Sequence, residues 1–218
     1  MKAEALAKLE TEMQSCSACP LRKDCLAPCG WYGNPDSPIV FVGEGPGQVE
    51  DDYGCPLIGP SGQLLDKALW STKMTRDRVM TTNVIKCRPK NNRTPDVAEA
   101  EYCAKQWLEK ELEILQPKVI VALGGVAMHY LGDQDMRITR DRGQWFRTRQ
   151  GFDCIATFHP AYLLRLYGHQ QVEAKWQVFY DLEAARKRAE ELSPGYQFMS
   201  EEKTELFKIF KKRHVDFL

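Results

Sequence analysis

The stretch Ile39-Val-Phe-Val42, followed at once by Gly43-Glu-Gly-Pro-Gly47, decides the fold of this chain. Its first four residues are apolar and partly β-branched, a pattern that predicts a buried strand. The glycines that follow permit positive backbone φ angles and let the main chain approach a ligand closely. Two acids, Glu50 and Asp51, come next. A strand that runs into a glycine-rich turn with carboxylates predicts a binding crevice at the strand ends of an open α/β sheet.

Three further strands are expected downstream from short apolar runs, at residues 79–85, 118–123 and 154–158. The last run follows residues 144–149 across a turn at Gln150-Gly151, which predicts a hairpin-like unit. Helical spacing of apolar residues predicts helices over residues 2–14, 62–70, 96–115 and 170–192. Strands alternating with helices predict an α/β sandwich with a mainly parallel, four-stranded central sheet. The order of the strands does not follow from this pattern.

The length of 218 residues suits one well-buried domain with an extension. Ser193-Pro-Gly195 separates a charged last segment, so we expect a domain over residues 1–192 and a helical extension over residues 193–218. The sequence has no apolar run of membrane-spanning length and no signal-type apolar core near its start. These features predict a cytoplasmic protein that makes no contact with a membrane.

Charge is unevenly distributed along a chain whose formal net charge is zero. Residues 73–93 carry seven Lys or Arg against one acid, and residues 137–149 carry five Arg against one acid. The zero net charge argues against a globally basic nucleic-acid binder. One basic face would nevertheless fit the phosphate backbone of DNA. The alternative is that these charges are simply solvated.

Eight cysteines in an intracellular chain indicate metal or cluster ligation rather than disulfides, because the cytosol keeps thiols reduced. Cys16 and Cys19 form a C-x2-C pair, and Cys87 and Cys103 are separated by fifteen residues. The two pairs can close around one four-thiolate site that holds an iron–sulfur cluster or a structural zinc. A compact local site is also possible, made of Cys16, Cys19, Cys25 and Cys29. Cys55 and Cys154 are expected to be buried and unligated.

These cysteines occur in order with three further motifs: Gly43-Glu-Gly-Pro-Gly47 with Glu50-Asp51, Thr82-Asn-Val-Ile-Lys-Cys-Arg-Pro89, and His159-Pro-Ala-Tyr-Leu-Leu-Arg165. The set resembles the family 4 uracil-DNA glycosylases, the iron–sulfur type, over about residues 16 to 185. The resemblance implies a three-layer α/β/α fold and a [4Fe–4S] cluster on Cys16, Cys19, Cys87 and Cys103. It also implies a monomeric, monofunctional enzyme at the prokaryotic nucleoid. Such an enzyme hydrolyses the N-glycosidic bond of deoxyuridine in single- and double-stranded DNA, releasing uracil and leaving an abasic site.

The resemblance also implies roles for individual residues in cleaving that bond. Glu44 would stabilise the positive sugar and orient water, and His159 would stabilise the leaving uracil through its O2. Asn83 would pair with uracil N3–H and O4, and Glu50 would crowd a methyl group at C5. Backbone of Gly43 and Gly45 would complete the base pocket.

DNA contacts are implied by the same resemblance, because the target base must leave the duplex. The segment of Tyr162, Leu163, Leu164 and Arg165 would enter the minor groove with a leucine wedge. Contacts with DNA are also expected at Ser61 and Arg88.

Two positions depart from the family pattern. Gly45 stands where the family usually has Ala. Leu57 stands where the family usually stacks a phenylalanine on uracil, and base–aromatic stacking is worth roughly 1–3 kcal/mol. The expected result is a slower uracil glycosylase; the alternatives are an altered base preference, or an iron–sulfur DNA-binding relative with weak activity. A nucleotide-cofactor enzyme is disfavoured, because Gln48 replaces the third glycine of G-x-G-x-x-G and Pro46 removes a backbone donor.

The tail from Ser200 to Leu218 is amphipathic, with apolar residues set among lysines and Arg213. We expect a docked or solvated helix there. A basic contact with DNA is the second interpretation. The last five residues, 214–218, also resemble the short sequences by which bacterial repair proteins bind the sliding clamp.

Overall fold

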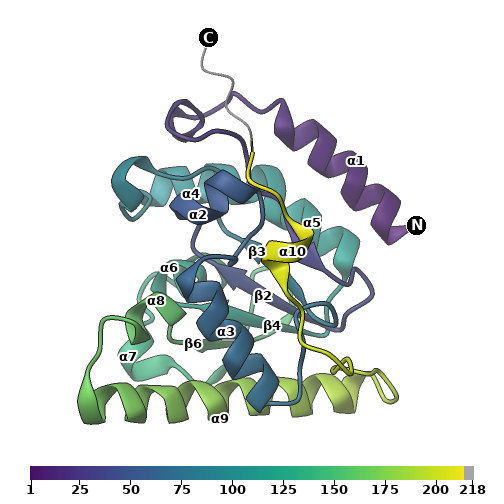
Figure 1. The fold of residues 1–218 in the computed structure, drawn as a ribbon, viewed down its shortest axis with the longest axis vertical. Coiled ribbons are helices and arrows are strands. Elements are labelled where there is room, and N and C mark those ends of the chain that lie inside the picture. The colour runs from purple at the N-terminus through teal and green to yellow at the C-terminus, as the bar shows by residue number, and fades with distance from the viewer. Residues whose placement is uncertain (214–218) are drawn as a thin grey trace.

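A six-stranded mixed sheet forms the centre of the computed structural model, which describes residues 1–213 (Figure 1). Four parallel strands lie in the middle, in the order β3 (Met80–Asn83), β2 (Ile39–Gly43), β4 (Val119–Leu123) and β6 (Asp153–Thr157). Short antiparallel strands, β1 (Tyr32–Gly33) and β5 (Trp145–Arg147), pair with β3 and β6 at the two edges. The four expected strands and the hairpin of β5 with β6 are confirmed. The sequence analysis missed β1, which is only two residues long.

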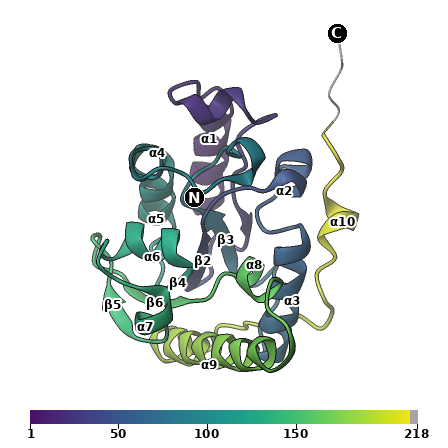
Figure 2. The same cartoon turned by 90° about the vertical axis from the view of Figure 1, so that its left-hand side faces the viewer.

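Helices cover both faces of the sheet, which gives the expected three-layer sandwich (Figures 1 and 2). Val40, Val42 and their neighbours in the sheet face one layer of helices, made of α1 (Lys2–Gln14), α4 (Val97–Cys103), α5 (Glu109–Leu115) and α6 (Gly125–Leu131). Ile39 and Phe41 face the opposite layer, made of α3 (Pro60–Ser71), α8 (Pro160–Leu163) and α9 (Gly168–Leu192). Every residue of β2 and β4 is buried, as expected for strands covered on both faces.

The helix expected over residues 96–115 is divided into α4, a π-helical turn over Ala104–Leu108, and α5. A short helix, α2 (Gln48–Tyr53), follows the glycine-rich turn and ends at Gly54 in the left-handed conformation. A further single turn, α7 (Ile138–Asp141), precedes β5. None of the helices in residues 1–213 is both long enough and apolar enough to cross a bilayer.

The prediction of a helix over the tail from Ser200 is wrong for most of residues 200–213, because only α10 (Leu206–Ile209) is helical there. The rest of residues 194–213 runs over the surface as an extended chain (Figures 1 and 2). Separate partners on the domain explain this: Phe207 stacks edge-on against Tyr53, and Phe210 against Tyr32. The clamp-like segment, residues 214–218, lies outside the described residues.

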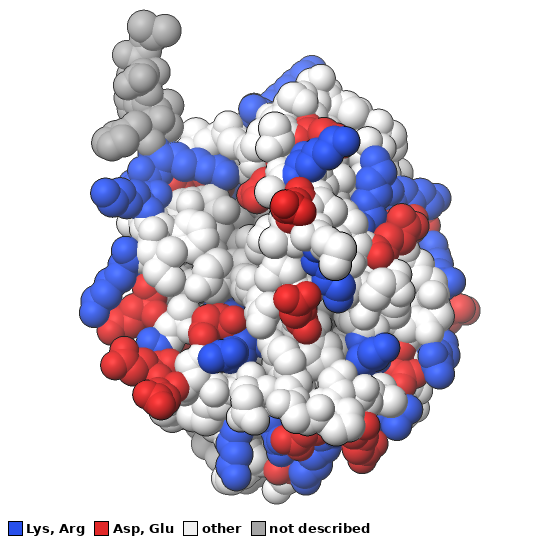
Figure 3. Space-filling view, turned by 90° about the vertical axis from the view of Figure 1, so that its right-hand side faces the viewer, with Lys and Arg blue, Asp and Glu red and all other residues white. Residues whose placement is uncertain are grey.

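Burial removes part of the positive charge that the sequence predicted for one basic face. Arg76 and Lys86, both in the first basic run, are 2% and 1% exposed and pair with Asp66 and Glu111. On the side of the molecule drawn in Figure 3, Lys and Arg are interspersed with Asp and Glu.

Candidate active site

A cavity of about 580 Å³ opens at the carboxyl ends of the central strands. The loops that follow three of these strands line it, together with the segment that leads into α3: residues 44–50 after β2, residues 85–94 after β3, residues 159–165 after β6, and residues 57–61. The structure therefore brings Glu44 and His159 to one cavity, at the edge of the sheet where open α/β folds place their ligands.

Glu44 follows β2 directly and lines this cavity. Its loop is fixed by main-chain hydrogen bonds, because Val84 N donates to Gly43 O at 2.9 Å and Ile85 N donates to Glu44 O at 3.0 Å. Burial raises the pKa of the Glu44 carboxyl above its ordinary value, and the nearby Arg165 partly offsets this effect. The result is a carboxylate with little solvent around it, which acts more strongly on a nearby positive charge than an exposed one would.

Asn83 ends β3, is 1% exposed and is not among the residues that line the cavity, although Glu44 and Ile85, which follow β2 and β3, are. It stands opposite Gly43 in the parallel register, and a Cβ on Gly43 would lie 2.4 Å from Asn83 Oδ1. Neither Oδ1 nor Nδ2 of Asn83 has a hydrogen-bond partner among the described residues. Buried amides almost always pair, so this one carries a free donor and a free acceptor suited to a ligand with a complementary edge. A side chain at residue 43 would overlap this amide, so only glycine fits opposite Asn83.

His159 caps the N-terminus of α8, and its Nδ1 accepts a hydrogen bond from Ala161 N at 3.1 Å. In a neutral imidazole whose Nδ1 accepts, the proton is on Nε2, which is then a donor. Burial, and then the charge of Arg165, lower the pKa of His159 to about 4. The ring at neutral pH is therefore an uncharged donor in the cavity wall.

Glu50 lines the cavity, but both of its carboxylate oxygens already accept backbone hydrogen bonds. Oε2 accepts from Gly47 N at 3.1 Å, and Oε1 accepts from Gly59 N at 2.7 Å. The side chain therefore joins the loop after β2 to the loop before α3. This arrangement fixes the carboxylate at the rim of the cavity.

Leu57 also lines the cavity, is 5% exposed, and packs with Leu65 of α3. Its φ of +54° lies in the left-handed region, which is uncommon for a residue other than glycine. The buried Arg76 donates from Nη2 to the Leu57 carbonyl, and its Nε lies 3.2 Å from Asp66 Oδ1. These contacts hold an unfavourable backbone conformation and direct the side chain into the cavity wall.

The segment after β6 is divided between the cavity and the core. Tyr162, Leu164 and Arg165 line the cavity, and Leu164 is 44% exposed. Leu163 is 3% exposed and packs in the core, because one turn of α8 directs it towards α3 and α9. The contact with DNA expected of Leu163 is therefore corrected: this side chain is not accessible, whereas that of Leu164 is.

Ser61 lines the cavity as well, whereas Arg88 lies outside the cavity lining and donates from Nε to Asn92 Oδ1 at 2.7 Å. The sequence analysis missed the loop that Arg88 supports, whose residues Asn92, Arg93 and Thr94 line the cavity. Its signal was the Asn91-Asn92 pair, since asparagine tolerates positive φ and these two adopt +57° and +54°. That pair indicates a turn, and nothing in it indicates a contact with the cavity.

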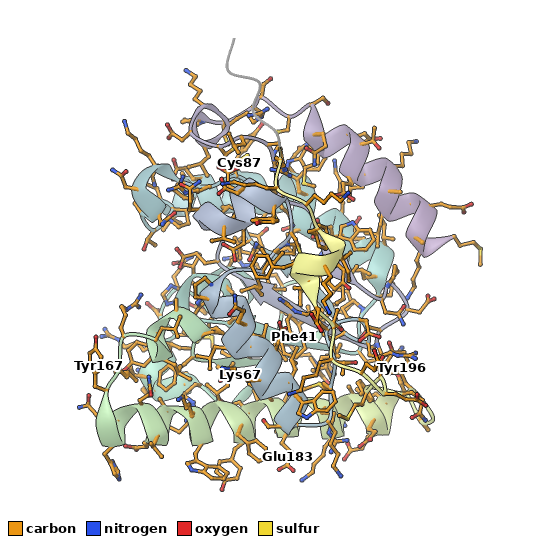
Figure 4. All side chains as sticks on the ribbon, viewed as in Figure 1. Phe41, Lys67, Cys87, Tyr167, Glu183 and Tyr196 are labelled. Carbon is orange, nitrogen blue, oxygen red and sulfur yellow. The ribbon has the colours of Figure 1, made fainter. Side chains whose placement is uncertain are left out.

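The cysteines of the two expected pairs pack against the same core cluster. The Cys87 thiol hydrogen-bonds to Cys25, and Cys103 Sγ accepts from Lys86 N at 3.3 Å. Cys87 lies where the cysteine-rich segment meets α2 and α4 (Figure 4). Among residues 1–213, no three or more His, Cys, Asp or Glu side chains stand in a metal-binding arrangement. Cys55 and Cys154 are buried, as expected.

The chemistry of this thiol set nevertheless fits a four-thiolate group. Burial, with the neighbouring Cys19 and Cys16, raises the pKa of the Cys103 thiol to about 11. The hydrogen bond with Cys25, burial, and the neighbouring Cys103 and Cys19 raise the pKa of the Cys87 thiol. Soft thiolates gathered from three separate segments are the ligands that iron–sulfur clusters and zinc select. Cys25 is a fifth thiol within this group, in addition to the four that the resemblance implies as ligands.

Comparisons with known proteins identify the family of the chain. The family model described as the uracil DNA glycosylase superfamily matches residues 31–183. A type-4 uracil-DNA glycosylase of Thermotoga maritima is 40% identical over 185 residues, which are 84% of this chain and 94% of that protein. Proteins of the same name from Archaeoglobus fulgidus and Sulfurisphaera tokodaii are 38% and 36% identical, over 74% and 72% of this chain and 84% and 75% of their own lengths. The chain therefore belongs to the type-4 branch of the uracil-DNA glycosylase superfamily.

Proposed function

We propose that this protein is a DNA repair glycosylase that hydrolyses the N-glycosidic bond of deoxyuridine and leaves an abasic site. The observation that carries the proposal is the buried Asn83 amide, whose donor and acceptor are both without partners among the described residues. Uracil offers N3–H and O4 side by side, which match Oδ1 and Nδ2 of this amide. Cytosine offers the reverse pattern, so an amide held in this orientation would reject it.

The bond between C1′ and N1 would break with both electrons passing to uracil. The Nε2–H of His159 would hydrogen-bond to uracil O2, where much of the negative charge gathers. Glu44 would face the sugar, stabilise its positive charge and orient a water for attack at C1′. The water oxygen becomes the new hydroxyl of the sugar and its proton leaves to solvent or uracil. No covalent bond to the protein is needed, so the enzyme would be monofunctional.

Recognition of the base would also use the cavity rim. Glu50 would lie against C5, where a thymine methyl would clash with a carboxylate fixed by Gly47 and Gly59. Leu57 would cover one face of the base without the stacking that an aromatic ring supplies. Backbone of Gly43 and Gly45 would lie against the base, since neither carries a side chain.

The DNA strand would pass over the loop after β6. Leu164, which is exposed, would fill the gap left by the everted base, and Tyr162, Arg165 and Ser61 would contact the strand. Arg88 would act through the neighbouring loop that it supports. Both single- and double-stranded DNA are proposed substrates, for a monomer that works at the prokaryotic nucleoid. A sliding-clamp contact through residues 214–218 remains a proposal from the sequence alone.

The same proposal assigns Cys16, Cys19, Cys87 and Cys103 to a [4Fe–4S] cluster, with structural zinc as the alternative. The thiol set supports this assignment through its chemistry. When bound, the group would cross-link the N-terminal segment to the loop after β3 and to α4. Cys25 would remain a neighbour of the cluster, held by hydrogen bonds to Arg22.

An excision assay tests the function. Oligonucleotides with one uracil are incubated with the protein, and abasic sites are revealed by alkaline cleavage. Wild type should cleave, Asn83→Ala and His159→Ala should lose about 100-fold or more in rate, and His169→Ala, on the exposed surface of α9, should match wild type. The alternative function, a DNA-binding relative with weak activity, is favoured by Leu57. Equal binding of duplexes with and without uracil, and no product, would support it instead.

A further inference from the structure

The described part of the C-terminal tail is attached to the domain through residues 200–213, which we call the strap. Thr204 Oγ1 donates to Asp77 Oδ1 at 2.9 Å, and Leu206, 4% exposed, packs with Cys55 and Ile58. Phe207 and Phe210 then stack on Tyr53 and Tyr32. Figures 1 and 2 show the strap, in yellow, running past α3 towards α2. The strap lies beyond residues 31–183, which the family model matches.

Arg213 ends the strap in a slot made of main-chain groups. Its Nη1 donates to Ala27 O at 2.9 Å and to Asp51 O at 3.1 Å, and its Nη2 donates to Pro28 O at 2.9 Å. Its own N donates to Asp52 O at 2.7 Å. Gly54 forms one wall, because a Cβ there would lie 2.5 Å from the Arg213 Nη2. A planar guanidinium with several fixed donors fits three carbonyls better than an ammonium group would.

The slot joins the cysteine-rich segment to α2. The first of these carries proposed cluster ligands, and the second carries Glu50 at the cavity rim. Ala27 and Pro28 belong to the cysteine-rich segment, whose Leu26 N donates to Asp51 Oδ1 at 2.9 Å. Asp51 belongs to α2, directly after Glu50. An adjacent ion pair, Lys212 Nζ to Asp52 Oδ2 at 3.2 Å, adds a second contact between the strap and α2.

The position of α2 determines the rim of the base cavity. Glu50 on this helix accepts hydrogen bonds from the backbone of Gly47, which lines the cavity, and of Gly59, which lies in the loop between the lining residues Leu57 and Pro60. The segment after α2 carries Leu57 in the cavity wall. Glu44, Asn83 and His159 are held differently, by the ends of β2, β3 and β6.

We propose that Arg213 is a positioning residue that fixes α2 against the cysteine-rich segment and thereby shapes the base cavity. The inference rests on the proposed uracil excision. Loss of the contact should loosen the rim formed by Glu50 and Leu57 while leaving the strand-end groups in place. Base binding therefore weakens, and the rate at saturating DNA is retained.

The test compares Arg213→Ala and Arg213→Lys with Lys211→Ala, an exposed position on the same strap. KM and kcat are measured on uracil-containing DNA, and free uracil is used as an inhibitor to report on the base cavity without DNA. Loss of hydrogen bonds to a charged group predicts a rise of about tenfold in KM and in the inhibition constant for Arg213→Ala. We expect kcat within about twofold of wild type, an intermediate Arg213→Lys, and an unchanged Lys211→Ala.

Hydrogen exchange at the amides of α2 supplies a readout that does not need activity. Arg213→Ala should exchange faster there than Lys211→Ala, with equal exchange in β4. Unchanged KM and inhibition constant in folded Arg213→Ala would overturn the inference, as would unchanged exchange in α2 or a fall in kcat alone. If Arg213→Ala does not fold, Arg213→Lys carries the same comparison. A wild type that releases no uracil would refute the proposed function, whereas an active wild type with unaltered Arg213 variants would refute only the role of Arg213.

Discussion

His159 Nδ1 accepts a hydrogen bond from Ala161 N, 3.1 Å away at the start of α8. The same ring has its pKa lowered to about 4 by burial and by Arg165. Both observations describe a neutral imidazole whose Nε2 carries the proton. A neutral donor can stabilise a departing anion without the site first gaining a proton. The pH dependence of activity should therefore not follow the titration of an ordinary histidine.

Activity should not decline near the ordinary histidine pKa of about 6.5. As pH falls, Glu44, whose pKa burial raises above its ordinary value of 4.5, protonates before His159, and the charge proposed to stabilise the sugar is then lost. We therefore expect kcat/KM to stay level from pH 8 to about 6 and to fall at more acid pH. Glu44→Gln should have a low rate, and its kcat/KM should not fall further at acid pH. A fall in the kcat/KM of wild type centred near pH 6.5, which disappears in His159→Gln, would contradict a neutral ring.

Leu57→Phe should raise the efficiency of excision. Arg76 and Asp66 already hold residue 57 in the conformation that directs its side chain to the cavity, so a phenylalanine would be presented in the same way. Stacking of roughly 1–3 kcal/mol predicts an increase of about tenfold or more in kcat/KM. Leu57→Met is the matched control, since it has similar volume and no ring. Equal gains from Met and Phe would show that the ring is not needed for the effect, and no gain from Phe would refute the stacking argument.

The four parallel strands could be predicted from sequence because each is a short apolar run buried on both faces. The meeting of Glu44 and His159 at one cavity could be predicted too, since parallel strands end at one edge of a sheet. Other features depend on distant contacts. Leu163 and Leu164 are adjacent leucines, and only the turn of α8 buries the first and exposes the second. The strap has a helical pattern, but its aromatic side chains bind Tyr32 and Tyr53 instead.

Gly45 gives a prediction about packing beside the catalytic loop. A Cβ on this residue would lie 2.4 Å from Ile85 Cγ1, and its φ is not positive, so the conflict with alanine is steric alone. Overpacking of this kind costs about 1–3 kcal/mol. We expect Gly45→Ala to lower the free energy of unfolding by that amount in wild type, and by much less in an Ile85→Ala background. A denaturant double-mutant cycle measures the difference. Strictly additive effects would show that the cost of Gly45→Ala does not arise from contact with Ile85.

The cysteine assignment predicts which thiols hold the metal. Cys103 accepts a hydrogen bond from Lys86 N and belongs to the proposed set, whereas Cys154 is buried among Ile120 and Ala122 at a sheet face. An iron–sulfur cluster should make the purified protein brown, with charge-transfer absorption near roughly 400 nm. Cys103→Ser should lose this absorption and most of its iron, and Cys154→Ser should keep both.

Cys25→Ser separates the two arrangements of ligands that the sequence left open. Retained absorption supports the set of Cys16, Cys19, Cys87 and Cys103, whereas loss would place Cys25 among the ligands. A colourless wild type containing zinc would instead establish the structural alternative.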